Sequence, residues 1–487
     1  MQPIMLQGTS SDAGKTTLVA GLCRLFANRG LRVAPFKSQN MALNSFVTQD
    51  GGEIARSIAM QAAGARQEPI VHMNPLLLKP KADDVAQLIV HGKAYADVQA
   101  RSYFLSDELQ DLKLEAIRSS IEYLKGNYDL IIAEGAGSCA EPNLRRLDVV
   151  NMGLAHMLQA RVYIIVDVNK GGAFADILGT LEVMRLTEPG DIGLVEGFLL
   201  NKFRGDREVL QPAIEFTDRH AGKGIVGVLP YLHGLTLEEE DRIREYRPEH
   251  TEVDIAVLYL PHISNANDFD FLGEEPNVSV RYARSAEALG VPDAVIIPGT
   301  KNTTWDLDYL RRTGIEKRLR DLADSTPIIG ICGGYQMLGR KLYDPKHLES
   351  EIGTIDGMGL LDLEVQFESE KTLVRRTYSP TSENFLAAAG HVTGYEIHSG
   401  TIIYGTSNPA FTYPGGVDGA VHPERRILGT FIHDIFSNPK FTRTFVNSLR
   451  LAKGLEPLAG PLPIARDRMN ESYERVAEAL AEHGKFG

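Results

Sequence analysis

The sequence contains one cysteine whose neighbours are typical of a catalytic nucleophile. Cys332 follows an apolar, strand-like run over residues 326–331, and two glycines, Gly333 and Gly334, come directly after it and open a helix-like segment. A turn from strand to helix lifts a side chain out of the sheet, and glycine tolerates the strained backbone and leaves room for a substrate. The partial positive charge at the helix N-terminus favours the thiolate. We therefore expect Cys332 to be a nucleophile, although a buried structural role is the usual fate of a single cysteine in an α/β core.

A thiol nucleophile needs a base, and two of the 13 histidines stand in suitable contexts. His433 ends the apolar run over residues 427–432, so it can return to the sheet edge beside the cysteine. His398, in the segment Gly-Tyr-Glu-Ile-His, is the alternative. We favour His433 because of its strand context. A Cys–His pair of this kind attacks a carboxamide carbon, forms a thioester and releases ammonia.

The oxyanion that forms during such an attack needs two backbone N–H donors. Gly333, directly after the nucleophile, is expected to supply one. The loop with Gly299 and Thr300, which ends a preceding strand-like run, is expected to supply the other.

A second chemical motif lies at the start of the chain. The segment Gly-Thr-Ser-Ser-Asp-Ala-Gly-Lys-Thr-Thr follows the first predicted strand and opens the first predicted helix, which is the context of a phosphate-binding P-loop. The backbone N–H groups would hold phosphate oxygens, Lys15 would neutralise them, and Thr16 would bind Mg²⁺. The expected ATP-binding residues are Gly8, Thr9, Asp12, Gly14, Lys15, Thr16 and Thr17.

A cation that bridges phosphates needs carboxylate ligands near the loop. Glu134 ends the apolar run over residues 130–133 and is the expected partner of Thr16, although a solvated acid at a strand end is the plain alternative. Asp50 and Glu53 are further candidates as ligands. Asn201, at the end of another strand-like run, is a candidate for contact with the nucleotide base.

The elements that carry these motifs form two alternating blocks of strand and helix, which predicts an α/β fold with parallel sheets. Strands are expected at residues 4–7, 32–36, 130–133, 162–166, 197–200 and 224–229, and a second block begins at residue 254. We predict a P-loop domain over residues 1–234, a charged linker over 235–251 with an acidic run at 238–241, a second α/β domain over 252–440, and a C-terminal helical segment over 441–487.

Composition excludes several classes of protein. The 487 residues carry a net charge of −13, which argues against nucleic acid as a partner. Three cysteines are too few for a disulfide framework and fit a reducing cytoplasm. No apolar run approaches the length of a membrane span.

Together these motifs resemble a known family. The long P-loop resembles that of dethiobiotin synthetase, and the Cys332 half resembles class I glutamine amidotransferases. Most of the latter carry a Glu two residues after the catalytic histidine, where this chain has Ile435. The combination of such an ATPase with a glutaminase that lacks this Glu resembles the cobalamin-pathway amidotransferases, whose pattern is a Cys–His dyad. Further segments similar to that family lie at residues 34–45, 73–80, 201–206 and 394–398.

The resemblance implies ATP, Mg²⁺, glutamine and a corrinoid as ligands. It implies amidation of the b, d, e and g carboxylates of adenosylcobyrinic acid a,c-diamide through a phosphorylated carboxylate. Two alternatives remain: the related enzyme that forms the a,c-diamide itself, and a P-loop switch protein with a degenerate glutaminase-like domain. Candidate contacts to the anionic corrinoid are Lys37, Ser38, Gln39, Asn40, Lys79, Arg146 and Asp148.

Overall fold

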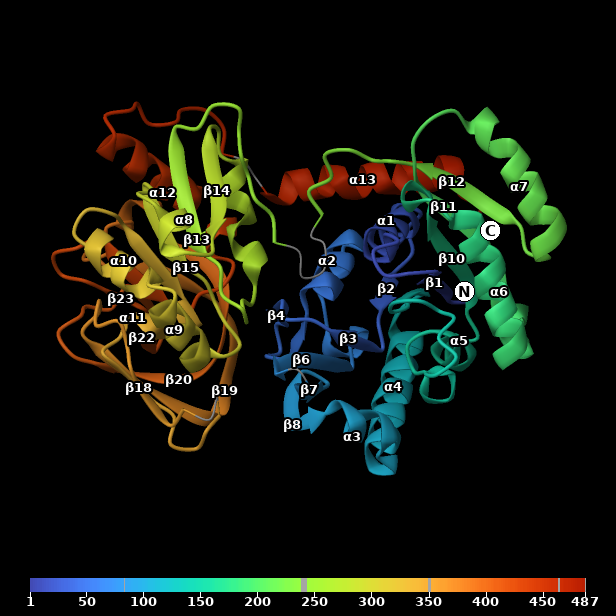
Figure 1. The fold of residues 1–487 in the computed structure, drawn as a ribbon, viewed down its shortest axis with the longest axis horizontal. Helices are drawn as coiled ribbons and strands as arrows, with labels where there is room; N and C mark the ends of the chain where they lie inside the picture. Colours follow the sequence, from blue (N-terminus) through green and yellow to red (C-terminus); the bar gives the residue numbers. More distant parts are fainter. Residues whose placement is uncertain (83, 238–242, 349–351, 463–464, 487) are drawn as a thin grey trace. The chain divides into compact units, whose positions relative to one another are not determined.

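The computed structural model describes residues 1–82, 84–237, 243–348, 352–462 and 465–486. The chain forms two compact units (Figure 1). The first comprises Met1–Ala42, Gly52–Glu240 and Arg466–Gly487, and the second comprises Leu43–Gly51 and Asp241–Ala465. The acidic run at residues 238–241, which we place in a linker, lies outside the described residues. Within the described part of the chain, no helix combines the length and the apolar character that a membrane span requires.

The first unit is built on a sheet of six parallel strands in the order β12-β11-β10-β1-β9-β2. Each of the six strands expected in this half of the sequence is present. Because β1 lies between β9 and β10, the loops after these three strands meet at one edge of the sheet, which is where α/β proteins bind ligands. The strands are β1 (Ile4–Gly8), β2 (Val33–Phe36), β9 (Leu130–Glu134), β10 (Arg161–Asp167), β11 (Val195–Phe203) and β12 (Ile225–Pro230).

One face of this sheet is covered by α1 (Lys15–Asn28) together with the last helix of the chain, α13 (Ala465–His483) (Figure 1). Side chains alternate along a strand, so Ile4 and Leu6 point to this face and join a core that includes Val476 and Leu480 of α13. The segment expected as one C-terminal appendage is therefore divided. Its first helix, α12 (Pro439–Ala452), belongs to the second unit, whereas α13 belongs to the first.

The remaining elements of the first unit surround this sheet. A smaller sheet runs in the order β3-β6-β7-β8, formed by β3 (Gln39–Met41), β6 (Leu76–Ala82), β7 (Val85–Val90) and β8 (Lys93–Gln99). The strand β5 is Glu53–Ala55. The helices are α2 (Arg56–Gly64), α3 (Ala100–Leu105), α4 (Asp107–Asn127), α5 (Met152–Leu158), α6 (Ala173–Thr187) and α7 (Arg207–Ala221).

The second unit is built on a sheet in the order β14-β13-β15-β16-β24-β23, parallel except for β23. Since β16 and β24 are neighbours, with Ile331 opposite Thr430, the residues that follow these two strands meet at the same edge. The strands are β13 (Val253–Leu258), β14 (Val278–Ala283), β15 (Ala294–Ile297), β16 (Ile328–Ile331), β23 (Ala420–Val421) and β24 (Ile427–Thr430).

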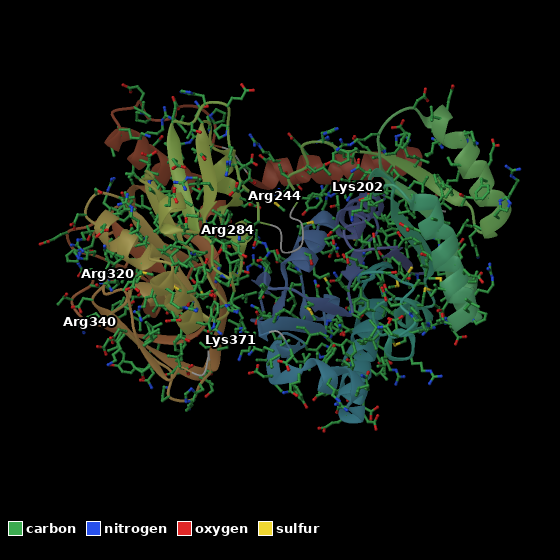
Figure 2. The ribbon with its side chains drawn as sticks, in the orientation of Figure 1. Lys202, Arg244, Arg284, Arg320, Arg340 and Lys371 are labelled. Carbon is green, nitrogen blue, oxygen red and sulfur yellow. The ribbon has the colours of Figure 1, made fainter. Side chains whose placement is uncertain are left out.

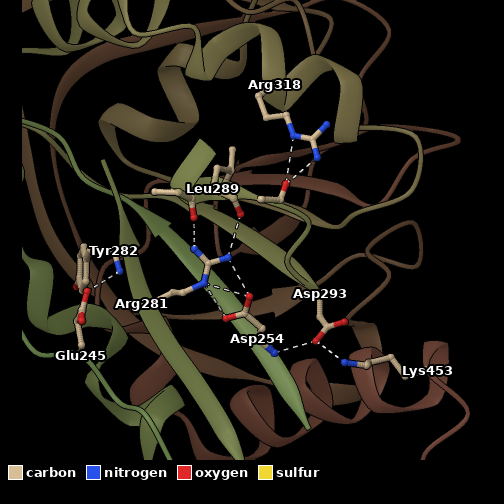
Figure 3. A network of polar contacts seen from close by, with 10 residues as sticks. Glu245, Asp254, Arg281, Tyr282, Leu289, Asp293, Arg318 and Lys453 are labelled. Carbon is tan, nitrogen blue, oxygen red and sulfur yellow. Dashed lines mark hydrogen bonds and ion pairs between the residues drawn. The ribbon is translucent and has the colours of Figure 1, made fainter. Parts of the chain in front are cut away.

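A polar network fixes the opposite edge of this sheet (Figure 3). The guanidinium of Arg281 on β14 donates to both carboxylate oxygens of Asp254 on β13. Asp293, just before β15, accepts a hydrogen bond from the Asp254 N–H at 2.8 Å and another from Lys453, after α12, at 2.8 Å. These bonds hold the amino ends of β13 and β15 in register, at the end of the sheet opposite to the carboxyl ends of its strands.

The unit is completed by a second sheet and by short helices. This sheet runs β18-β17-β19-β21-β22 with β20 paired to β19. Its strands are β17 (Lys341–Tyr343), β18 (Thr354–Asp356), β19 (Leu363–Pro380), β20 (Val392–Tyr404), β21 (Phe411–Tyr413) and β22 (Gly416–Asp418). The remaining elements are β4 (Ser45–Val47), α8 (Ala286–Leu289), α9 (Thr303–Arg312), α10 (Ile315–Leu322), α11 (Gly333–Leu338) and the 3₁₀ stretch η5 (Ala266–Glu274).

Candidate functional site

Cys332 lies in a strained turn between β16 and α11. Its backbone angles are φ 53° and ψ −111°, a left-handed conformation that costs a non-glycine residue about 1–3 kcal/mol. The Cys332 N–H donates to the carbonyl of Thr430 at 2.8 Å, which ties the turn to the end of β24. The side chain is 8 % exposed, and its Sγ lies 3.3 Å from the carbonyl oxygen of Ile397. This is the strand-to-helix elbow that the sequence predicts.

The structure brings His433 to this cysteine. Its backbone N–H donates to the carbonyl of Tyr395 at 2.8 Å, and its buried side chain lies close enough to the Cys332 thiol for the thiol to raise the pKa of His433. A base next to a thiol can form a thiolate–imidazolium pair.

Asp268 in η5 orients the ring of His433. Its Oδ2 accepts a hydrogen bond from the His433 Nδ1 at 2.7 Å, and its Oδ1 accepts one from the Asp434 N–H at 3.1 Å. Burial alone would lower the pKa of His433, but the charges of Asp268 and Cys332 raise it to about 10. The expectation of a bare Cys–His dyad is therefore corrected. Ile435 occupies the position of the usual Glu, and Asp268, from another part of the unit, supplies the carboxylate that contacts His433.

His398, the alternative base, is occupied elsewhere. Its Nδ1 lies 2.9 Å from the carbonyl of Gly400 and its Nε2 lies 3.1 Å from Glu396, while its ring stacks on Phe431 at 3.6 Å. Since both ring nitrogens already have partners, neither is available to a thiol.

The expected oxyanion donors lie side by side next to the elbow. A Cβ atom placed on Gly333 would be 3.1 Å from the Thr300 nitrogen, so the two backbone N–H groups border the same space. The Thr300 hydroxyl is fixed by Asp306 and by the carbonyl of His262. The carbonyl of Gly299 accepts a hydrogen bond from the Ser264 N–H, and a Cβ there would be 3.1 Å from His433 Cε1, so the lack of a side chain at Gly299 leaves room beside the histidine.

In the first unit the P-loop connects β1 to α1 as predicted. Lys15 Nζ donates to the carbonyls of Ser10 and Gly137, each at 3.0 Å, so its ammonium is held over the loop. Gly14 has φ 98°, which a side chain would strain. Asn201 donates through Nδ2 to the carbonyl of Ala13 at 2.8 Å, so it supports the loop, a contact that differs from the expected one with a nucleotide base.

A cleft of about 310 Å³ lies at the same edge of this sheet. Lys202, at the carboxyl end of β11 (Figure 2), reaches the carbonyl of Asp12 at 2.6 Å and Asp167 at 3.0 Å. The cleft is lined in part by Val168, Gly172, Phe174, Lys202, Phe203 and Arg204.

Glu134 is enclosed by three donors. It accepts hydrogen bonds from Thr16 Oγ1 at 2.9 Å, from Lys37 Nζ at 3.1 Å and from the amide of Gln61. Thr16 and Glu134 present adjacent oxygen atoms, the ligand type that Mg²⁺ prefers, so they fit an ion whose other ligands are phosphate oxygens and water.

The other predicted metal ligands have partners of their own. Asp50 accepts a hydrogen bond from the Thr48 hydroxyl, and Glu53 forms a buried ion pair with Lys79 at 2.8 Å. In the described part of the chain, no group of three or more His, Cys, Asp or Glu side chains is placed to hold a metal ion. The charge of Glu53 is offset by Lys79, and the roles of Asp50 and Glu53 as metal ligands stay predictions.

Most of the predicted corrinoid contacts are engaged within the first unit. Lys37 and Lys79 are buried in ion pairs rather than free to meet a polyanion. Ser38 donates to the carbonyl of Val149, Gln39 accepts from Tyr103 and Asn40 donates to Ser57. The carboxylate of Asp148 accepts bonds from the backbone N–H groups of Val150, Asn151 and Gly153. Arg146 is exposed and remains a candidate.

Two family models match separate parts of the chain. Residues 4–243 match the family model of the CobQ/CobB/MinD/ParA nucleotide binding domain, and residues 254–441 match that of the CobB/CobQ-like glutamine amidotransferase domain. A cobyric acid synthase of Pelotomaculum thermopropionicum is 46 % identical over 98 % of this chain and 93 % of its own length. A cobyric acid synthase of Desulforamulus reducens is 43 % identical over 99 % of this chain and 96 % of its own length.

Proposed function

Because the chain belongs to the cobyric acid synthase family, we propose that it amidates the b, d, e and g carboxylates of adenosylcobyrinic acid a,c-diamide, with ATP as activator and glutamine as nitrogen donor. The observation that carries this proposal is the presence of both half-reactions in one chain. A buried Cys332–His433–Asp268 arrangement lies beside two backbone N–H groups, and a P-loop with Lys15 is formed in the other unit.

In the glutaminase half-reaction the Cys332 thiolate attacks the side-chain carboxamide carbon of glutamine. The N–H groups of Gly333 and Thr300 stabilise the oxyanion, and the imidazolium of His433 gives its proton to the leaving ammonia. Asp268 keeps Nδ1 protonated, so that Nε2 exchanges protons with sulfur and nitrogen. The thioester is then cleaved by water, which His433 deprotonates, and glutamate leaves.

In the synthetase half-reaction the P-loop holds the phosphates of ATP. Its backbone N–H groups and Lys15 bind the phosphate oxygens, and the terminal phosphoryl group passes to a carboxylate of the corrinoid. Ammonia then attacks the carbonyl carbon of this acyl phosphate and inorganic phosphate leaves. Thr16 and Glu134 would hold Mg²⁺, which when bound offsets charge on the phosphate oxygens.

We assign the cleft beside Lys202 to the nucleotide base. It lies at the carboxyl ends of β10 and β11, and apolar Phe174 and Phe203 line it together with glycine backbone. Arg146 is proposed as a contact to the corrinoid carboxylates. A cytoplasmic location would keep the Cys332 thiol reduced.

Two variants test whether Cys332 releases the ammonia and Lys15 serves the ATP-dependent step. Cys332→Ala is expected to lose amidation with glutamine and to keep amidation with ammonium salts, because only the source of ammonia is removed. Lys15→Ala is expected to lose amidation with either nitrogen source. A Cys332→Ala enzyme that ammonium fails to rescue, or a Lys15→Ala enzyme with near-normal synthesis, would overturn the assignment.

The switch-protein alternative rested on the missing Glu at Ile435. Asp268 removes that support, because a protein that only binds nucleotide has no use for a thiol and an imidazole held by a buried carboxylate.

A further inference from the structure

A short segment of the chain, Leu43–Gly51, leaves the first unit and packs in the second. We refer to it as the insert segment. At its two ends the chain continues into β3 and β5 of the first unit. Its Val47 is fully buried in a small apolar cluster with Tyr395 and Ile397 of β20, and the ring of Phe46 lies 5.3 Å from that of Tyr395.

Ser45 of the insert segment is tied to two neighbours of the catalytic histidine. Its N–H donates to Asn265 Oδ1 at 2.8 Å, and its carbonyl accepts a hydrogen bond from the Tyr395 hydroxyl at 2.9 Å. Tyr395 stacks on His433 with ring centroids 5.5 Å apart and planes 19° apart. Asn265 Nδ2 lies 3.1 Å from His433 Nδ1. Ser45 therefore holds two residues that contact the His433 ring, Tyr395 and Asn265.

The bond from Ser45 decides which end of the Asn265 amide faces the histidine. A backbone N–H can only donate, so the amide oxygen must face Ser45 and the NH₂ group must face His433 Nδ1. An NH₂ group is a donor, and it favours an Nδ1 that carries no proton. Asp268 is an acceptor 2.7 Å from the same nitrogen and favours an Nδ1 that carries one. Asn265 and Asp268 thus compete over the proton that the proposed mechanism requires.

We propose that the insert segment restrains the glutaminase, because Ser45 holds Asn265 in the orientation that opposes the catalytic protonation state of His433. This inference rests on the proposed function and adds its regulation. When Ser45 withdraws, the Asn265 amide turns, its oxygen accepts from Nδ1–H together with Asp268, and the rate of glutamine hydrolysis rises. Asn265 is a positioning residue here, since it acts through His433.

Bonds within the first unit connect the P-loop to Lys37, which precedes the insert segment in the chain. Thr16 of the P-loop bonds to Glu134, Glu134 bonds to Lys37, and Lys37 lies just before β3, after which the insert segment begins. A cation at Thr16 competes with Thr16 and Lys37 for the Glu134 oxygen atoms, and phosphates compete with Glu134 for the Thr16 hydroxyl, so ligands at the P-loop act on Lys37 and on the chain that follows it. Glutamine hydrolysis would then rise when the synthetase site is occupied, which limits the loss of ammonia.

The test compares glutamate release by the full-length wild type, Asn265→Asp and Asn265→Ala, with and without a non-hydrolysable ATP analogue and the corrinoid substrate. In Asn265→Asp, one carboxylate oxygen still accepts from the Ser45 N–H, and the other places an acceptor toward His433 Nδ1 in place of the NH₂ group. We expect Asn265→Asp to raise the ligand-free rate about fivefold, the factor that one hydrogen bond is worth, and to reduce the stimulation by ligands. We expect the ligand-free rate of Asn265→Ala to lie between the rates of the wild type and Asn265→Asp.

The pH profile separates this role from a structural one. The groups that face the His433 ring are the Asp268 carboxylate, the Cys332 thiol, the Asn265 amide and the stacked phenol of Tyr395. An added acceptor at Nδ1 should move the basic limb of kcat to higher pH in Asn265→Asp, whereas a merely structural defect lowers kcat without moving it. A ligand-free rate that is unchanged or lower in Asn265→Asp, with an unshifted pH profile, would overturn the inference.

A second variant acts on the other bond to Ser45. Tyr395→Phe keeps the ring against His433 and removes the hydroxyl that holds Ser45, so it should also raise the ligand-free rate. Tyr404→Phe is the matched control, because its hydroxyl donates to a carbonyl, that of Gly419, in the same unit. An equal effect of both variants would contradict the inference. If the wild type released no glutamate under any ligand condition, the proposed function itself would fail, which is a distinct result.

Discussion

Replacing Asp268 by Asn is the sharpest single test of the glutaminase site. The substitution keeps the size of the side chain and removes the negative charge 2.7 Å from His433 Nδ1. Asp268 is the strongest of the influences that raise the pKa of His433 to about 10 against the opposing effect of burial. Without this charge, burial opposes only the remaining influence of Cys332, and the pKa of His433 falls toward its ordinary value of 6.5.

The magnitude follows from this pKa. The difference between 6.5 and about 10 corresponds to a net of about 5 kcal/mol in favour of the imidazolium, which remains after burial has opposed the influences of Asp268 and Cys332. A hydrogen bond to a charged group contributes about 1.5–3 kcal/mol, so the loss of Asp268 should lower kcat for glutamine hydrolysis by about 10- to 150-fold. The basic limb of the pH profile should move from near pH 10 toward neutrality, because the variant loses its imidazolium proton earlier.

The assay is glutamate release from pH 6 to 10, with ammonium-dependent amidation as the internal control for folding. Asp191→Asn is a matched variant, since Asp191 is a buried carboxylate 2.9 Å from His156 in the other unit. We expect it to leave the pH profile of glutaminase in place. Wild-type kcat and an unmoved basic limb in Asp268→Asn would refute the role of Asp268.

Three further predictions follow from the packing. A Cβ on Gly333 would be 2.6 Å from Thr300 Cγ2, so Gly333→Ala should obstruct the oxyanion donors and lower kcat for glutamine hydrolysis by about 10²-fold, with ammonium-dependent synthesis retained. Glu134→Gln leaves the buried ammonium of Lys37 without its counter-charge, which should cost about 3–5 kcal/mol of stability, seen as a lower Tm in thermal unfolding. Because the pKa of His433 is raised on folding, its stabilising contribution is complete below pH 6.5 and is lost as pH rises toward 10; an equal loss of Tm over this interval in wild type and Asp268→Asn would contradict that linkage.

Local patterns were sufficient to predict the elements that carry the two motifs. An apolar run followed by glycines and a helix-like segment describes a short stretch of chain, and both the P-loop after β1 and the elbow after β16 are formed as predicted. Asp268 could not be found in this way, because it lies 165 residues before His433 and only the order of strands brings the two together. The available signal was a polar run, Asn265 to Asp268, soon after the carboxyl end of β13.

The roles of charged residues were harder to predict than their positions. Lys37 and Lys79 follow or occupy strands near the ligand edge, as a substrate-binding cation would, yet each is buried against a carboxylate. Composition shows the charge of a side chain but not its burial or its partner. The same limit applies to the insert segment and to α13, since their packing depends on contacts far along the chain.

The most direct test of the proposed function is mass spectrometry of adenosylcobyrinic acid a,c-diamide incubated with the protein, glutamine and Mg·ATP. We expect stepwise conversion through partial amides until the b, d, e and g carboxylates are all amidated. No conversion of the diamide, together with amidation of the parent acid at its a and c carboxylates, would contradict it and assign the chain to the diamide-forming reaction.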